Sequence, residues 1–394
     1  MESLPHSHTL VHDAVGPDLP LDEVLAAIAL GVVSLLLAGV LSAVLGELAD
    51  EHRLSAARIG LTASFEALSM GTTTALAGVF LPPRHLRWLA AGAVVLLSVA
   101  DLSTLNASGG SIMAIRTLAG IPEGILLWIT VGMIARTATP ERWSGVFFTA
   151  LTSGQLVVAL LFAQWILPSY GADGGFVALA GLSLFGIVAA IIIPPNYAPL
   201  AQNDGASGVP PLRGWFALFA TLIYIGATAT VGIFLQPLAH EAGLSAKVAW
   251  TAIWVSLAAQ IAGGASATLA AGHVRYFTVF AVSSAIVIAT WLTYLAHPPA
   301  WLFIASTAVG GYITIFYSPF LIPMTIEADP SRRAAVLSGS TQVLAGALGP
   351  FAASFVVSDG NVHGAIRLGT VLLLIGLGLI AALHFTSKSN SHPS

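Results

Sequence analysis

Four ionisable residues stand inside long apolar runs in the first half of the chain: Glu66, Asp101, Arg116 and Glu123. A charge at the centre of a membrane helix costs about 2.5–3.5 kcal/mol on insertion scales, so such a residue faces a partner or water. Burial favours the neutral form of a carboxyl group and a nearby Arg favours its charged form, so a carboxyl group between these influences can bind and release a proton. We therefore interpret Glu123, Glu66 and Asp101 as candidate proton-coupling residues, and Arg116 as the anchor for substrate or charge.

The spacing of these four residues predicts how they meet. Glu123 follows Arg116 by two helical turns and lies on nearly the same face. Asp101 and Arg116 fall at similar depth on consecutive antiparallel spans, which predicts an ion pair, and Glu66 has Arg116 or Glu123 as its partner. A static ion pair that fixes helix register is the alternative for each residue. For the functional reading, we expect the four to converge on a wet crevice between two halves of the protein.

The composition indicates a protein that lies mostly in lipid. Of 394 residues, 56% are hydrophobic and 8% are charged, whereas soluble globular proteins carry roughly 25% charged residues. The net charge of −4 and the lack of a basic run exclude a nucleic-acid partner. The lack of cysteine excludes disulfides, thiolate metal sites and cysteine nucleophiles. His6, His8, His12 and Asp13 are interpreted as part of a polar tail rather than as a metal site.

Twelve apolar runs are long enough to cross a hydrocarbon core of about 30 Å as helices, which takes about 20 residues each. They are 24–46, 59–81, 88–105, 111–135, 143–167, 174–193, 214–238, 248–271, 276–296, 300–326, 334–357 and 368–385. The predicted fold class is an all-α polytopic membrane protein with two pseudo-symmetric six-helix bundles. The predicted domains are a polar cytoplasmic tail 1–20, a bundle 21–193, a central cytoplasmic loop 194–212, a bundle 213–386 and a cytoplasmic tail 387–394.

The two halves show signs of a duplication. A His-x-Arg sequence follows the second span at His85 and returns after the eighth at His273, 188 residues later. Basic residues collect on inside loops in any case, which is the alternative explanation. Nine Lys and Arg residues lie on the side of the termini and four on the other, so the bias predicts that both termini are cytoplasmic. We expect a multi-pass protein of the plasma (inner) membrane.

A motif in the fourth span, Arg116-Thr117-Leu118-Ala119-Gly120-Ile121-Pro122-Glu123-Gly124, resembles a span-4 pattern of the major facilitator superfamily, in which Gly follows an Arg by four residues. With twelve spans and parallel six-span repeats, the resemblance covers nearly the whole chain. It implies that spans 1, 4, 7 and 10 line a central cavity. The chain departs from the family after span 2, where Pro82 stands in the place of an acidic residue before the basic end at Arg84 and Arg87. This departure puts the family's usual inner-gate charge network in doubt.

The resemblance implies candidate solute ligands among the polar and aromatic residues of the cavity spans. These are Tyr224, Thr228, Gln236, Tyr312 and Tyr317, joined by Ser34 and Ser42 in span 1 and by Gln155, Gln260 and Gln342 in spans 5, 8 and 11. Hydrogen bonds between helices are the alternative role for each. Helix bends at Pro and Gly predict gating positions, with tight packing as the alternative. The gating candidates are Pro122, Arg87, Gly310, Pro319, Gly349 and Pro350.

The function predicted is a secondary active transporter that moves a small organic solute, an anion or an amphipathic compound, by alternating access and with proton coupling. A drug or metabolite efflux antiporter is the alternative, although span 5 lacks the Gly-Pro motif of drug–proton antiporters. A non-transporting receptor or membrane enzyme is a third reading. No Walker A loop or His-Glu-x-x-His motif is present, so we expect no enzymatic activity and no cofactor. The expected partners are the solute, the proton and the bilayer, with the protein as a monomer.

Overall fold

The computed structural model of the protein describes residues 19–36, 40, 44–45, 47–48, 51–54, 56–198, 200, 209–357 and 362–389. The regular structure in these residues is helical. The first half contains α1 (Leu21–Leu35), α3 (Ala56–Phe80), α4 (Leu86–Ser103), α5 (Gly110–Ile134), α6 (Pro140–Leu161), η2 (Phe162–Ile166) and α7 (Leu167–Ile192). The second half contains α8 (Leu212–Gly232), α9 (Leu235–Glu241), α10 (Ala246–Ala270), α11 (Tyr276–Leu295), α12 (Ala300–Tyr317), η3 (Ser318–Phe320), α13 (Leu321–Ala328), α14 (Arg333–Ala353) and α15 (His363–Ser389).

These elements form the expected all-α polytopic architecture. Among the described residues, three spans consist of more than one element: α6 continues into η2, α8 is followed by α9, and α12 continues through η3 into α13. Within the described residues, eight helical segments are long and apolar enough to cross a membrane. Large side chains such as Phe80, Trp88 and Leu212 are more than three-quarters exposed, as expected for a surface that faces lipid. Residues 1–18 with their histidines, and Ser42 in the expected first span, lie outside the described residues.

Glycine and proline set two of the helix breaks. Gly171 has a left-handed backbone (φ 61°) where the chain passes from η2 and the first residues of α7 into the long part of α7. A Cβ there would lie 2.5 Å from Oε1 of Glu51, which accepts a hydrogen bond from the Ala172 backbone N–H at 2.8 Å. In the tenth span, Pro319 lies in the short η3 turn, because proline has no N–H to continue the ladder.

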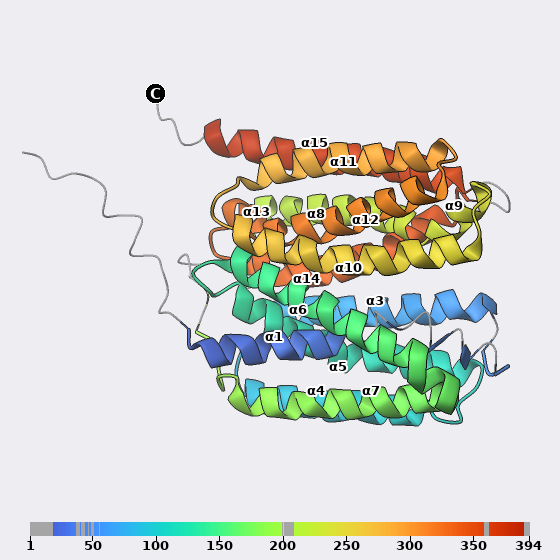
Figure 1. The fold of residues 1–394 in the computed structure, drawn as a ribbon. Helices are drawn as coiled ribbons and strands as arrows, with labels where there is room; N and C mark the ends of the chain where they lie inside the picture. Colours follow the sequence, from blue (N-terminus) through green and yellow to red (C-terminus); the bar gives the residue numbers. More distant parts are fainter. Residues whose placement is uncertain are drawn as a thin grey trace, which may run out of the picture.

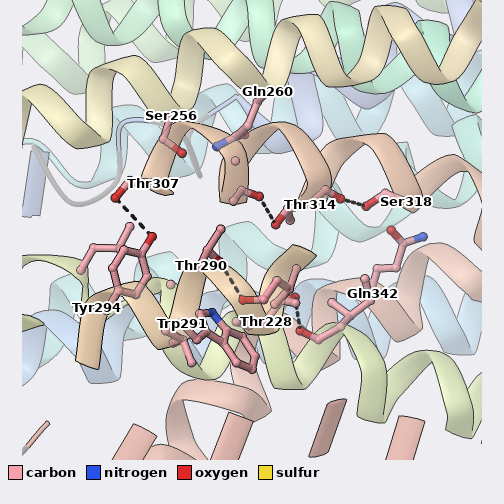
Figure 2. A pocket seen from close by; sticks show the side chains of 18 of the residues that line it. Thr228, Ser256, Gln260, Thr290, Trp291, Tyr294, Thr307, Thr314, Ser318 and Gln342 are labelled. Carbon is pink, nitrogen blue, oxygen red and sulfur yellow. Dashed lines mark hydrogen bonds between the residues drawn. The ribbon is translucent and has the colours of Figure 1, made fainter. Parts of the chain in front are cut away.

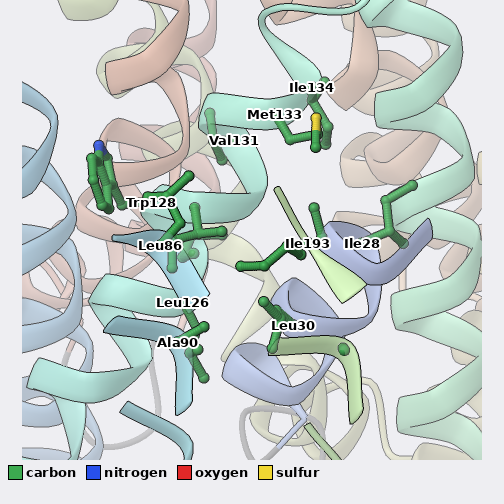
Figure 3. Packing of buried hydrophobic residues seen from close by; sticks show 14 of the residues in the cluster. Ile28, Leu30, Leu86, Ala90, Leu126, Trp128, Val131, Met133, Ile134 and Ile193 are labelled. Carbon is green, nitrogen blue, oxygen red and sulfur yellow. The ribbon is translucent and has the colours of Figure 1, made fainter. Parts of the chain in front are cut away.

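Each half has a hydrophobic core, and the core of the first half also takes in Ile322, Ala335 and Val336 of the second. In the first half, Ile28 and Leu30 of α1 pack with Leu126 of α5 and with Leu86 and Ala90 of α4 (Figure 3). In the second half, the buried aromatic side chains of α8, α11 and α12 form the corresponding core. Figure 1 shows the two halves stacked with their helices roughly along one direction.

The halves meet mainly at one end of the bundle. We call the end where α1 begins and α15 ends the termini side, which is the left end in Figure 1. Near this side, α3 packs on α14 and α6 packs on α10. A Cβ added to Gly78 would lie 2.7 Å from Cδ2 of Leu337, and one added to Gly339 would lie 2.6 Å from Cγ2 of Val131. The bundle is therefore closed between its halves at the termini side.

Candidate functional site

A cavity of about 490 Å³ lies beyond these closing contacts, toward the opposite side. Its walls come from α8, α9, α10, α11, α12, η3 and α14, and Leu35 of α1 completes them from the first half. The lining includes Thr228, Ser256, Gln260, Thr290, Trp291, Tyr294, Thr307, Gly310, Thr314, Ser318 and Gln342, with apolar residues between them (Figure 2). Across the opposite side, Trp254 of α10 reaches the core cluster of the first half that contains Leu36.

The expected cavity spans were only partly right. Spans 7 and 10 contribute as the resemblance implied, and span 1 contributes Leu35, but the described part of span 4 contributes no lining residue. Span 9 lines the cavity through Val287, Thr290, Trp291 and Tyr294, which the sequence analysis missed. These residues lie in a continuous apolar run, where a polar side chain is usually interpreted as a helix–helix contact. Their spacing of three and four residues places them on one face of the helix, and this spacing could have indicated that the face lines a cavity.

The predicted solute ligands divide into lining and supporting residues. Thr228 and Gln342 line the cavity, and so does Gln260. Tyr317 is fully buried behind the wall and its hydroxyl lies 2.9 Å from the Thr228 hydroxyl. Tyr224 is also fully buried, and its hydroxyl lies 3.0 Å from that of Ser284. The two tyrosines pack edge to face, so they support the position of Thr228.

The other four described candidates lie away from the cavity wall. Gln155 donates a hydrogen bond to the Leu35 carbonyl at 2.8 Å and so links α6 to α1. Tyr312 stacks on Phe316 within α12. Gln236 is exposed on the short helix α9. Ser34 is buried and donates to the carbonyl of Gly31 in its own helix.

The four intramembrane charges form one cluster inside the first half. The Arg116 guanidinium pairs with Glu66 through Nη2 and Nε, and with Oδ1 of Asp101 through Nη1 at 2.7 Å. Oε1 of Glu123 lies 3.6 Å from Nη2. The Arg116 side chain is 0% exposed, and its guanidinium carbon lies 5.7 Å from the centre of the Phe176 ring. The pairing of Asp101 with Arg116 agrees with the depth argument.

The cluster does not face the cavity, contrary to our expectation. None of its members lines the space between the halves, and all four are at most 4% exposed. The reason is the close packing of α3 on α5, where a Cβ added to Gly120 would lie 2.5 Å from the Glu66 carbonyl oxygen. This packing turns the charged face of α5 toward α3, α4 and α7. In this conformation Arg116 is in no position to anchor an anionic solute in the cavity.

Gly145 and Thr149 of α6 interlock with Gly264 and Thr268 of α10, and we call these four residues the α6–α10 seam. A Cβ on Gly145 would lie 2.5 Å from Oγ1 and 2.9 Å from the backbone N of Thr268. A Cβ on Gly264 would lie 2.6 Å from Oγ1 and 3.0 Å from the backbone N of Thr149. Each threonine donates to the glycine carbonyl four residues earlier in its own helix. The same Gly-x-x-x-Thr arrangement on both helices brings the two halves into close contact.

Arg332 adds a polar contact between the halves at the termini side. Its Nη1 donates to the carbonyls of Ala135 at 2.8 Å and Thr137 at 3.0 Å, beyond the end of α5. Its backbone is left-handed (φ 60°) just before α14, a conformation that is uncommon outside glycine. Asp329 stabilises this turn by accepting hydrogen bonds from the backbone N–H groups of Ser331 and Ala334.

A second cavity of about 240 Å³ lies at the termini side and is lined by residues of both halves, including Trp128, Arg136 and Tyr197. The Arg136 guanidinium lies 5.1 Å from the centre of the Tyr197 ring and donates to the carbonyls of Gly132 and Ala198. Burial lowers the pKa of Arg136 to about 10, which leaves the side chain charged at neutral pH. Burial also raises the pKa of Tyr197 above its usual range.

The predicted gating residues occupy different environments. Gly310 lines the cavity and Pro319 forms the break in span 10. Pro122 is buried within α5. Arg87 donates from Nε to the Ile193 carbonyl at 2.7 Å, which ties the start of α4 to the end of α7. In the eleventh span, a Cβ added to Gly349 would collide with the Gly226 carbonyl oxygen of α8, and Pro350 follows it.

Comparisons with known proteins identify the fold. The sequence matches no protein-family model and no curated protein. The structure is similar to the E. coli fucose:proton symporter FucP, with a TM-score of 0.70 and 14% identity over 91% of this chain and 98% of FucP. It is also similar to the proton:xylose symporter XylE, with a TM-score of 0.67 and 12% identity over 92% of this chain and 94% of XylE. The human organic anion transporter MFSD10 gives a TM-score of 0.65 and 13% identity over 94% of this chain and 100% of that protein.

The architecture is therefore that of a polytopic helical membrane protein with two six-span halves and a cavity lined mainly by the second half. This is the fold of the major facilitator superfamily.

Proposed function

We propose that the protein is a secondary active transporter that moves a small organic solute across the plasma (inner) membrane by alternating access. The observation that carries the proposal is a cavity in the second half, with Leu35 of the first half in its wall, beyond a close contact of the halves on the termini side. A cavity of this size suits a small-molecule ligand. Rocking of the halves about the site would expose it to the other side in turn.

The names of the similar structures support the same function. They include proton symporters of fucose and xylose and an organic anion transporter. The bias of basic residues places both termini in the cytoplasm under this proposal. The structure then represents a state closed to the cytoplasm, and one of the FucP structures that it resembles is described as outward.

We also propose that transport is coupled to protons through the Arg116 cluster. Three carboxyl groups surround one guanidinium, and several kcal/mol per uncompensated ion disfavour full ionisation in such a site. Charge balance therefore requires the cluster to hold one or two protons. Glu123 is the farthest of the three from the guanidinium, so it is the residue that we assign to proton exchange. Because the cluster is closed in this conformation, exchange requires a rearrangement of α3 or α5.

Purified protein in proteoliposomes with an entrapped pH-sensitive dye tests the proposal. A solute panel of sugars, polyols, nucleosides, carboxylates and amines is added outside, and solute uptake and internal pH are followed together. We expect one class to enter and to change the internal pH. Uptake that ignores an imposed pH gradient would contradict proton coupling, and no uptake or exchange of any class would contradict transport. Uptake followed separately in right-side-out and inverted vesicles distinguishes an importer from an efflux antiporter.

A further inference from the structure

The described part of the cavity wall carries no charged side chain. Of the twenty described residues that line it, none is Asp, Glu, Lys, Arg or His. The nearby charges are grouped in the Arg116 cluster, which is separated from the cavity by the packing of the first half. An ion that enters this cavity loses water and meets no opposite charge, which is strongly unfavourable. The wall therefore selects against anions and cations alike.

The hydroxyl groups of the wall mostly present acceptors. Thr228, Thr290, Thr307, Thr314 and Ser318 each donate to a backbone carbonyl three or four residues earlier in the same helix. A hydroxyl has one proton and two lone pairs, so a hydroxyl whose proton is already used offers a ligand its oxygen. A ligand that fits this wall has to supply hydrogen-bond donors.

Four other polar groups of the wall have unused hydrogen-bonding capacity. Within the described part of the chain, no hydrogen bond involves the side chains of Gln260, Gln342, Ser256 or Trp291. Figure 2 shows Gln260 and Ser256 on the upper helix and Trp291 on the helix across the cavity. Gln342 lies on a third helix, at the right of the view. The two amides offer both donors and acceptors, and the indole N–H is a donor only. A bound ligand would form hydrogen bonds with these polar groups, because polar groups that lose contact with water need a hydrogen-bond partner.

The geometry points to an uncharged solute that is rich in hydroxyl or amide donors and has an apolar face, with Gln260 and Gln342 as the residues that determine specificity. The apolar face would contact Val231, Val287 and Val343, which also line the cavity. This inference rests on the proposed function, because it assigns the solute class to the proposed transport site. It replaces the sequence-based expectation of an anion, which depended on Arg116 facing the cavity.

Matched ligand pairs that differ in charge test this inference. The pairs are a hexose with its uronic acid and its amino sugar, and a nucleoside with its 5′-monophosphate. Binding to the full-length protein in nanodiscs is measured by calorimetry and thermal shift. We expect a neutral parent to bind and its charged counterparts to bind at least about tenfold more weakly. Gln260→Leu and Gln342→Leu should each weaken binding roughly tenfold, the equivalent of one lost hydrogen bond.

Gln236→Leu is the control, because it removes an exposed glutamine outside the cavity. Equal or tighter binding of the charged partner would overturn the inference, and so would unchanged binding in both cavity variants. No binding of any neutral parent up to about 10 mM, where a millimolar site is nearly saturated, would also overturn it. Binding of a neutral solute without flux would contradict transport and leave the site intact. Flux of an ion whose neutral parent does not bind would support transport and would overturn the assignment of an uncharged solute.

Discussion

The α6–α10 seam gives a direct test of alternating access. The double variant Gly145→Ala and Gly264→Ala adds two Cβ atoms that would lie 2.9 and 3.0 Å from backbone nitrogens of the facing helix. Backbone atoms have little room to move, so the helices have to separate. Overpacking of this kind typically costs about 1–3 kcal/mol. We expect the two substitutions to destabilise the conformation that is closed at the termini side by this amount, relative to the conformation that is open there.

A cost of about 1–3 kcal/mol changes the ratio of the two conformations by roughly 5- to 150-fold. The protein has no native cysteine, so a Val343→Cys variant places one thiol in the cavity wall. A membrane-impermeant maleimide applied from either side of oriented vesicles then reports access. In the double glycine variant, labelling from the opposite side should slow and labelling from the termini side should accelerate, and their ratio should change by that factor.

Gly181→Ala is the matched control, because a Cβ at this position of α7 meets nothing within 4 Å. A labelling ratio that stays within about twofold of the parent in the double variant would refute the assignment of the seam as the closing contact. A shift of the same size in Gly181→Ala would refute it as well, because the effect would then come from glycine replacement in general.

Three further predictions concern the charged residues. Glu123→Gln should abolish uptake driven by a pH gradient while solute exchange at equal pH persists; gradient-driven uptake at the parent rate would remove Glu123 from the coupling. Arg116→Gln should destabilise the protein by about 3–5 kcal/mol, because it leaves buried carboxyl groups without a counter-charge, and a loss below about 1 kcal/mol in detergent unfolding would contradict the ion-pair geometry. Arg332→Ala removes two charge-assisted hydrogen bonds between the halves, each worth about 1.5–3 kcal/mol. It should shift the cavity-thiol labelling ratio in the direction of the seam variant, whereas Arg142→Ala, which changes an exposed arginine at the start of α6, should not.

The sequence predicted the spans well because the length of an apolar run is a local property. It also predicted that Asp101 meets Arg116, since depth along consecutive helices follows from residue counting. The direction of the charged face could not be predicted in this way. Arg116 and Glu123 share a face of α5, but the neighbour of that face depends on how α3 and α5 pack at Gly120. That packing is a property of the assembled half.

The cavity wall was predicted less completely than the spans. Thr228 was identified because it is a polar residue of span 7, which the family resemblance favours, and Gln342 because it is a polar residue of a neighbouring span that could reach inward. Thr290 and Trp291 were missed because span 9 has no place in that scheme, although both line the cavity. Gln236 was wrongly counted as part of a continuous seventh span. The span breaks after Gly232, and Gln236 lies on the separate helix α9.

The acceptors that hold Arg332 are main-chain carbonyls of the other half. A carbonyl oxygen does not titrate, so these two acceptors remain available from mildly acidic to mildly alkaline solution. Among the described residues, the Arg332 side chain forms no ion pair, and the nearest acidic support is Asp329, which holds the turn before α14 rather than the guanidinium. Under the proposed coupling, a proton would act on the Arg116 cluster inside the first half, while the contact of Arg332 with the other half would respond to movement of the chain.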